Sequence, residues 1–132
     1  MSASFEGVRI LVAEDESALR NLLVTHFQTR GAQISSAKNG KAAFDLMKYR
    51  DFDVVITDIR MDQHGGVELI QNFHDQISKK PFVAVITGHA DPSENALLSM
   101  GANVVFFKPF SVRELERTLL LVLGKDAGFA TD

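Results

Sequence analysis

The stretch "DVVITDIR", residues 53–60, decides the fold, because an apolar and β-branched run there ends abruptly on an acid. The run from Val54 to Thr57 is too short to span a membrane and is typical of a strand buried on both faces. In open parallel sheets, ligands bind just beyond the carboxyl ends of the strands, where Asp58 would stand. Aspartate is also common in turns that follow strands, so this stretch alone leaves the role of Asp58 open.

The rest of the chain alternates between short apolar runs and segments with helical spacing. The expected strands cover residues 8–13, 32–37, 53–57, 81–87 and 103–107, and the expected helices cover 19–27, 40–49, 67–77, 91–101 and 111–123. Gly31 suits a helix C-cap, and Ser111 suits an N-cap, with Glu114 completing a capping box. Because strands and helices alternate with short connections, the sequence predicts an α/β fold with a parallel sheet covered by helices on both faces.

Two helical stripes carry expectations about the core. In the last helix, Val112, Leu115, Leu119 and Val122 recur at helical spacing and are expected to face the sheet. His26 lies on the apolar stripe of the first helix, so it is expected to serve packing rather than chemistry.

Composition narrows the class of protein. The length of 132 residues suits one domain with one core. The absence of cysteine excludes disulfides, zinc-thiolate sites and cysteine nucleophiles, and a net charge of −3 provides no basic field for nucleic acid. No apolar run approaches the ~20 residues of a membrane helix, and "MSASFEG" does not look like a signal peptide. A cytoplasmic protein that contacts neither nucleic acid nor membrane directly is therefore expected.

Polar residues stand at the ends of four expected strands. They are Glu14, Asp15 and Glu16 after the first, Asp58 after the third, Thr87 at the end of the fourth, and Lys108 after the fifth. In a parallel sheet these ends share one edge, so the side chains should converge. Carboxylates held close together repel one another unless a cation joins them, and oxygen ligands suit Mg²⁺ or Mn²⁺. A hydroxyl and a lysine beside them are suited to hold phosphoryl oxygens.

Four of these stretches together carry a family resemblance. They are "ILVAEDE" (10–16), "VVITDIRM" (54–61) with Gly66 eight residues after Asp58, "VITGHAD" (85–91) and "GANVVFFKPF" (101–110). The chain resembles the receiver domain of a two-component response regulator, and is similar in architecture to single-domain chemotaxis regulators. The resemblance implies a doubly wound, flavodoxin-like sheet of five strands in the order 2-1-3-4-5 flanked by five helices. It covers residues 7–124, which leaves 1–6 as an N-terminal extension and 125–132 as a tail or the start of a linker.

The resemblance also implies a chemistry for the strand-end residues. Asp58 would accept a phosphoryl group from the phosphohistidine of a histidine kinase or phosphotransfer protein. Asp15 would bind Mg²⁺ (or Mn²⁺) directly and Glu14 through water, with the Asp58 carboxylate and the Arg60 backbone carbonyl completing the protein ligands. Glu16 is expected to be an early-helix acid rather than a ligand.

The remaining family positions are Lys108 and Thr87. Lys108 would contact Asp58 or the incoming phosphoryl group, and Thr87 would close on that group afterwards. The peptide bond between Lys108 and Pro109 is usually cis in the family. The chain would then be a signalling receiver rather than an enzyme, catalysing only its own phosphorylation and slow autodephosphorylation.

Several positions depart from the family pattern or vary within it. Asp62 stands where many members have proline, and Val105 stands where the fifth strand usually carries an aromatic ring that moves inward with the threonine. Valine cannot report phosphorylation by the same ring movement. The side chains of Arg60 and His89 occupy variable positions and are expected to flank the water path to the acyl phosphate, which would set its lifetime.

The partner and the output remain open from the sequence. The face formed by the last strand and its flanking helices, with Phe106 and Phe107, is expected to bind a target or form a homodimer, unless both rings pack under the helices. The target would be another protein or the rest of a larger chain.

Two other classes of protein compete with the receiver. One is a phosphate-independent, receiver-like scaffold. The other is a flavodoxin-type cofactor binder or a phosphatase-like hydrolase. The acids "EDE" (14–16) after the first strand would repel a flavin phosphate. Haloacid-dehalogenase-type enzymes carry Asp-x-Asp on the first strand, whereas this chain has Glu-Asp-Glu there and its candidate nucleophile on the third.

Overall fold

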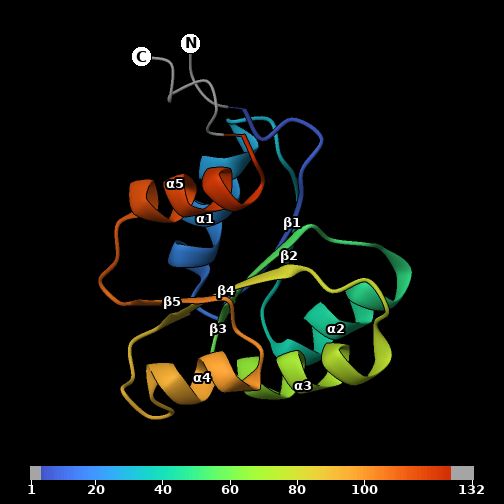
Figure 1. Ribbon diagram of the computed structural model, residues 1–132, viewed down its shortest axis with the longest axis vertical. Helices are drawn as coiled ribbons and strands as arrows, with labels where there is room; N and C mark the ends of the chain where they lie inside the picture. The colour runs from blue at the N-terminus through green and yellow to red at the C-terminus, as the bar shows by residue number, and fades with distance from the viewer. Residues whose placement is uncertain (1–3, 126–132) are drawn as a thin grey trace.

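The computed structural model describes residues 4–125 of the chain, so residues 1–3 of the expected extension and 126–132 of the expected tail lie outside the described residues. Its sheet has five parallel strands in the order β2-β1-β3-β4-β5, as expected (Figure 1). The strands are β1 (Arg9–Ala13), β2 (Gln33–Ala37), β3 (Val54–Asp58), β4 (Phe82–Thr87) and β5 (Val104–Phe107). Asp58 is therefore the last residue of the central strand.

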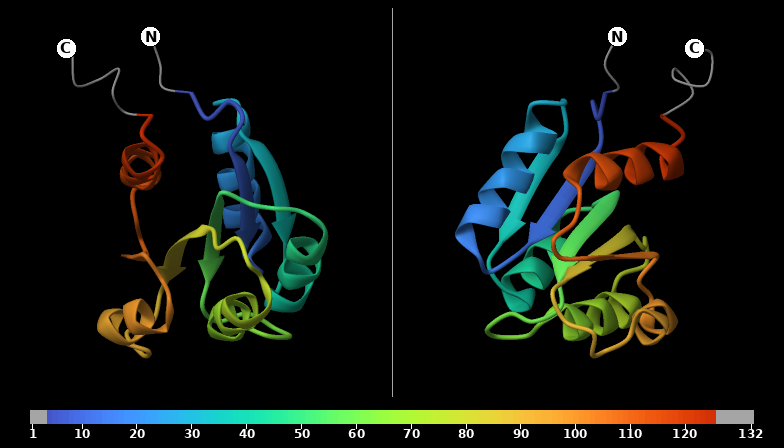
Figure 2. Two further views of the ribbon diagram at one scale, coloured as in Figure 1. Left: turned by 45° about the vertical axis from the view of Figure 1, so that its right-hand side comes forward. Right: turned by 90° about the vertical axis from the view of Figure 1, so that its left-hand side faces the viewer.

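Helices cover both faces of this sheet. They are α1 (Ser17–Gln28), α2 (Gly40–Tyr49), α3 (Gly66–Gln76), α4 (Glu94–Met100) and α5 (Val112–Val122). Helices α1 and α5 lie on one face, and α2, α3 and α4 lie on the other (Figures 1 and 2). Two helical layers around a parallel sheet are the doubly wound α/β architecture that the alternating pattern predicts.

Successive residues of the inner strands serve the two faces in turn. On β3, Val54 and Ile56 pack with α1 and α5, whereas Val55 packs with α2, α3 and α4. All five residues of β3 are buried, because this strand is covered by helices on both faces. A continuous apolar run in the sequence thus corresponds to a strand with no solvent face.

Side-chain caps define where three helices begin. Asn39 Oδ1 accepts the amide proton of Ala42 at 2.7 Å at the start of α2. Ser111 Oγ accepts from the Glu114 amide at 3.2 Å, so the expected cap of α5 is present. Ser93 caps α4 in the same way, which corrects the expected start of that helix at residue 91. The helix begins after Pro92 because the Ser93 hydroxyl accepts from the Ala96 amide, one of the free amides of its first turn.

Three packing expectations are corrected by the structure. Val122 is 48% exposed, and Leu120 is buried in its place beside Leu115 and Leu119, because the buried stripe of α5 drifts around the helix. His26 Nε2 makes a hydrogen-bond contact of 2.6 Å with Glu116 Oε1 on α5 rather than serving packing alone. Phe5 is fully buried against Phe27, so residues 5 and 6 of the expected extension belong to the folded body.

Among residues 4–125, none of the helices is both long and apolar enough to cross a membrane.

Candidate functional site

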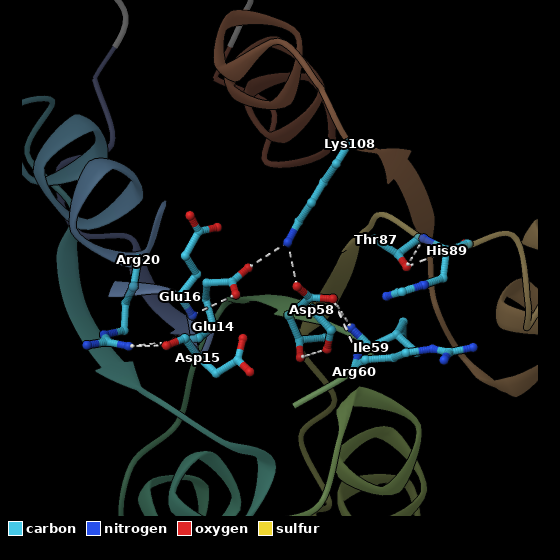
Figure 3. Close-up of polar contacts among 11 residues, drawn as sticks. Glu14, Asp15, Glu16, Arg20, Asp58, Ile59, Arg60, Thr87, His89 and Lys108 are labelled. Atoms are coloured by element: carbon cyan, nitrogen blue, oxygen red, sulfur yellow. Dashed lines mark hydrogen bonds and ion pairs between the residues drawn. The ribbon is translucent and has the colours of Figure 1, made fainter. Parts of the chain in front are cut away.

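The expected polar residues meet where β1, β3, β4 and β5 end. Glu14 and Asp15 follow β1, Asp58 ends β3, Thr87 ends β4, and Lys108 follows β5. Figure 3 shows the Lys108 side chain extending between the carboxylates of Glu14 and Asp58. The parallel register brings these residues together, because every strand presents its carboxyl end at the same edge.

Lys108 joins the two buried carboxylates. Its Nζ lies 2.6 Å from Asp58 Oδ2 and 3.2 Å from Glu14 Oε1. Glu14 is fully buried and Asp58 is 5% exposed, whereas Asp15 is exposed. One lysine thus offsets the charge of two acids that solvent scarcely reaches.

Backbone amides hold the other oxygen of Asp58. Asp58 Oδ1 accepts from the Ile59 amide at 2.6 Å and is 3.4 Å from the Arg60 amide. The two oxygens therefore have different partners, one a pair of amides and the other an ammonium group. This arrangement holds the carboxylate in one orientation.

Electrostatics at the site favour a bound cation. The pKa of Glu14 is raised to about 7, because burial and the charge of Asp58 raise it more than the hydrogen bond from the Glu16 amide lowers it. Burial lowers the pKa of Lys108, but its hydrogen bond to Asp58 and the charges of Asp58 and Glu14 outweigh burial, so the net direction is upward. A site that keeps an acid partly protonated near neutral pH would gain from a further positive charge.

The acidic cluster has a donor set that fits a hard divalent ion. Glu14, Asp15 and Asp58 each offer a carboxylate oxygen within 4.8 Å of the others. Oxygen-only ligands of this kind suit Mg²⁺, which takes one or two carboxylates and retains several waters. Arg20 Nη1 donates to the carbonyls of Glu14 and Asp15, at 2.8 and 3.4 Å, and so braces the acidic loop from α1.

Sequence reasoning missed Arg20, and it expected Glu16 within the early helix, whereas Glu16 directly precedes α1. An arginine in a first helical turn carries no distinct signal in the sequence, so only the fold could reveal the bonds of Arg20 to the loop. The Glu16 side chain points away from the acidic cluster (Figure 3), and its amide donates to Glu14 Oε2 at 3.0 Å.

Thr87 lies buried at the end of β4, with its hydroxyl engaged by the next loop. Thr87 Oγ1 accepts from the His89 amide at 3.1 Å. His89 itself is exposed, and its ring points back towards the region of Asp58 (Figure 3). Val105, at the varied position of β5, is 9% exposed and packs into the core on the α2–α4 side.

The loop after Asp58 is held by close backbone packing. Asp62 is exposed there, and Gln63 and His64 adopt positive φ angles of 51° and 67°. The Gly40 amide at the start of α2 donates to the His64 carbonyl at 2.7 Å. A Cβ on Gly40 would lie 2.3 Å from that carbonyl oxygen, so only glycine allows this approach.

Beyond β5 the chain turns sharply. The Lys108–Pro109 peptide bond is cis, and so is Asp91–Pro92, which sequence reasoning did not expect. Phe106 packs with the α1–α5 side of the core, whereas Phe107 is 42% exposed, so one ring of the pair packs and one does not.

The model of the response regulator receiver domain matches residues 10–120. The chain belongs to the response regulator receiver family. The match spans every strand and helix from β1 to most of α5, including all the strand ends described above.

Relatives of this receiver include full-length regulators. It is 31% identical over 115 residues to a probable transcriptional regulatory protein of Picosynechococcus, covering 81% of this chain and 45% of that protein. It is 29% identical over 106 residues to the response regulator SaeR of Staphylococcus epidermidis, covering 80% of this chain and 46% of SaeR. The chain therefore spans less than half the length of these curated relatives.

Solved receiver structures share the fold. The regulator TrrA of Thermotoga maritima, solved in complex with Mg²⁺–BeF, aligns with a TM-score of 0.74 and 29% identity over 85% of this chain and 96% of TrrA. The N-terminal domain of a Wolinella succinogenes protein aligns with a TM-score of 0.83 and 27% identity, over 96% of this chain and 100% of that domain. The two-component signalling class is thus shown by sequence and by fold together.

Proposed function

We propose that this receiver accepts a phosphoryl group on Asp58 from the phosphohistidine of a histidine kinase or phosphotransfer protein. The observation that carries the proposal is the setting of Asp58: a buried carboxylate at the end of the central strand, with Lys108 on one oxygen and two amides on the other. The match to the receiver family supports it.

The transfer exchanges one bond for another. An Asp58 oxygen attacks the phosphorus, an O–P bond forms, and the P–N bond to the donor histidine breaks, its electron pair remaining on the imidazole nitrogen. Such transfers depend mainly on position and on neutralising charge. The amides of Ile59 and Arg60 orient the carboxylate, and Lys108 remains as a cation beside the acyl phosphate.

A divalent cation, Mg²⁺ or Mn²⁺, belongs to the proposal. Asp15 and Asp58 would hold it directly, Glu14 through water, and the Arg60 carbonyl would complete the protein ligands. The bound ion would supply positive charge against the phosphoryl oxygens. The cluster of acidic oxygens within 4.8 Å supports this assignment, as does the Mg²⁺–BeF complex of the related TrrA.

Phosphoryl uptake from acetyl phosphate tests the proposal. We expect intact mass to show the gain of one phosphoryl group in the presence of Mg²⁺, and none after chelation or in Asp58→Asn. Asp62→Asn is the matched control, because it removes an exposed acid from the same loop and should leave uptake intact.

Absence of uptake has to be read together with metal binding. Some receivers accept phosphate only from their kinase, so uptake is paired with calorimetric titration of Mg²⁺. A chain that neither gains a phosphoryl group nor binds Mg²⁺ would be the phosphate-independent scaffold, which is the second candidate. Val105, which cannot act as a moving aromatic ring, is the observation that favours that candidate.

The lifetime of the acyl phosphate would depend on the side chains beside it. Exposed Arg60 and His89 lie on the two loops that flank Asp58. We expect replacement of both by alanine to change the rate at which the phosphorylated protein loses its phosphate. Intact mass measures the half-life of the phosphorylated protein. An unchanged half-life would show that Arg60 and His89 do not control the access of water to the acyl phosphate.

The output surface would be the face formed by α4, β5 and α5. Exposed apolar side chains on these three elements include Leu98 at 39%, Phe107 at 42% and Leu121 at 56% exposure. Phosphorylation would alter this face and so control binding of a target protein, of the rest of a larger chain, or of a second copy. Sedimentation with and without beryllofluoride tests the dimer, with Phe107→Ser as the variant expected to weaken it.

A further inference from the structure

The loop between β4 and α4, residues 88–93, is tied to the phosphorylation site by two side chains. The Thr87 hydroxyl accepts the His89 amide proton at 3.1 Å. The Arg60 guanidinium reaches across from the neighbouring loop, and its Nη2 donates to the Asp91 carbonyl at 2.9 Å. The residues that hold this loop therefore come from the strand end of β4 and from the segment directly after Asp58.

Arg60 begins beside the phosphoacceptor. Its amide lies 3.4 Å from Asp58 Oδ1, and Figure 3 shows its side chain leading from there towards the His89 side of the site. A phosphoryl group on Asp58 would therefore lie near the backbone end of the Arg60 side chain.

The two possible partners of the Arg60 guanidinium differ greatly in strength. The Asp91 carbonyl is a neutral acceptor in an exposed contact. A phosphoryl group carries up to about two negative charges on three acceptor oxygens, and a guanidinium can bind it through two parallel hydrogen bonds. The guanidinium carries its charge in both contacts, but only the phosphoryl group adds an opposite charge and accepts two bonds at once, so we expect it to bind Arg60 more strongly than the carbonyl does.

We propose that the Arg60 side chain is a phosphoryl ligand, which exchanges the Asp91 carbonyl for phosphoryl oxygens when Asp58 is phosphorylated. This inference rests on the proposed function, and it adds a second cation to Lys108 at the site. Its consequence is that phosphorylation removes a bond holding the loop of residues 88–93.

The released loop leads directly into α4. Ser93, two residues after Asp91, caps that helix through the Ala96 amide. The helix has only seven residues, and one face carries exposed Leu98. Loss of the Arg60 tie would thus pass the change of charge at Asp58 to the start of α4, by a route in which Val105 takes no part.

Beryllofluoride, a phosphoryl mimic, allows a direct test with Mg²⁺ present. We expect the mimic to speed amide hydrogen exchange of the wild-type segment 88–94 at least threefold. In Arg60→Gln this segment should already exchange fast without the mimic and change little with it. Affinity for beryllofluoride, measured by calorimetry, should fall about tenfold in this variant, because a charge-assisted bond is lost.

Two further variants sharpen the comparison. Arg60→Lys keeps the charge but not the forked geometry, so it should recover part of the lost affinity. Arg117→Gln removes an exposed charge from the middle of α5 and should match the wild type in both measurements.

The outcomes separate this inference from the proposed function. If Arg60→Gln binds the mimic as tightly as the wild type, with the same change in exchange, Arg60 is no phosphoryl ligand, while uptake at Asp58 still stands. If wild-type protein takes up neither the mimic nor a phosphoryl group, both proposals fall together.

Discussion

Lys108 and Asp58, 50 positions apart in the chain, form an ion pair of 2.6 Å across the carboxyl ends of β3 and β5, the two strands on either side of β4. The same ammonium lies 3.2 Å from buried Glu14. A single ammonium group therefore compensates the charges of both carboxylates. Replacing Lys108 should show how much their mutual repulsion destabilises the fold.

Lys108→Met should destabilise the protein by about 2–3 kcal/mol at neutral pH without metal, because two buried acids lose their counter-charge. The estimate lies below that for a fully buried pair, since 27% of the lysine side chain is exposed. Urea unfolding measures the loss, and millimolar Mg²⁺ should restore part of it by replacing the missing charge.

Lys48→Met serves as the control for Lys108→Met. Its partner Asp45 lies 3.5 Å away and both side chains are about half exposed, so the loss should stay below about 0.5 kcal/mol. Equal losses of unfolding free energy in the two variants would show that Lys108 stabilises the protein no more than an exposed surface lysine does.

Glu14 should give the protein a distinctive dependence on pH. Its folded pKa of about 7 lies above the unfolded value of 4.5, so the folded state binds this proton more tightly. The resulting stability is fully present below pH 4.5 and is lost as the pH rises through 7. Glu14→Gln lacks this loss, so its free energy of unfolding should increase relative to the wild type between pH 5 and pH 8.

The control for this prediction is Glu16→Gln, whose exposed carboxylate is the neighbouring acid. Its difference from the wild type should stay flat across the same pH range. Metal binding offers an independent check: because Mg²⁺ competes with the Glu14 proton, affinity for Mg²⁺ should weaken as pH falls from 8 to 6. A pH-independent affinity would contradict the role of Glu14.

Gly40→Ala should both destabilise the fold and weaken metal binding. The added Cβ would lie 2.3 Å from the His64 carbonyl oxygen, so the loop that carries the Arg60 carbonyl must move. We expect a loss of about 2 kcal/mol from overpacking, although glycine-to-alanine changes in helices otherwise stabilise. Urea unfolding and calorimetric Mg²⁺ titration measure the two effects.

Asn39→Ala is the companion variant for Gly40→Ala. It removes the adjacent N-cap of α2, which should cost about 1 kcal/mol and leave Mg²⁺ affinity unchanged. A Gly40→Ala protein as stable as the wild type would mean that the loop carrying His64 can move away from the added Cβ at no cost in free energy.

His26 and Glu116 should couple α1 to α5. Their contact of 2.6 Å is partly buried, and Glu116 also contacts Arg30 at 2.5 Å. A double-mutant cycle with His26→Ala and Glu116→Ala should give a coupling energy of about 1 kcal/mol in urea unfolding. Losses that simply add would show that the two side chains stabilise the helices independently.

The sequence could predict the architecture because its signals are local. Continuous apolar and β-branched runs such as 54–57, alternating with helical stripes, predict a parallel sheet covered on both faces. Parallel strands share one carboxyl edge, so the convergence of Glu14, Asp58 and Lys108 followed from their places at strand ends. The same reasoning failed for Val122, because helical spacing alone does not say which side of a broad stripe faces the sheet.

Contacts between distant side chains were decided only by the tertiary structure. The bonds from Arg20 to the acidic loop and from Arg60 to Asp91 depend on how loops pass one another, which no periodic pattern records. Burial of Glu14, and hence its raised pKa, required the complete sheet edge. Local spacing thus determined which groups meet at the strand ends, whereas packing decided which of them are desolvated, paired or held by a neighbouring loop.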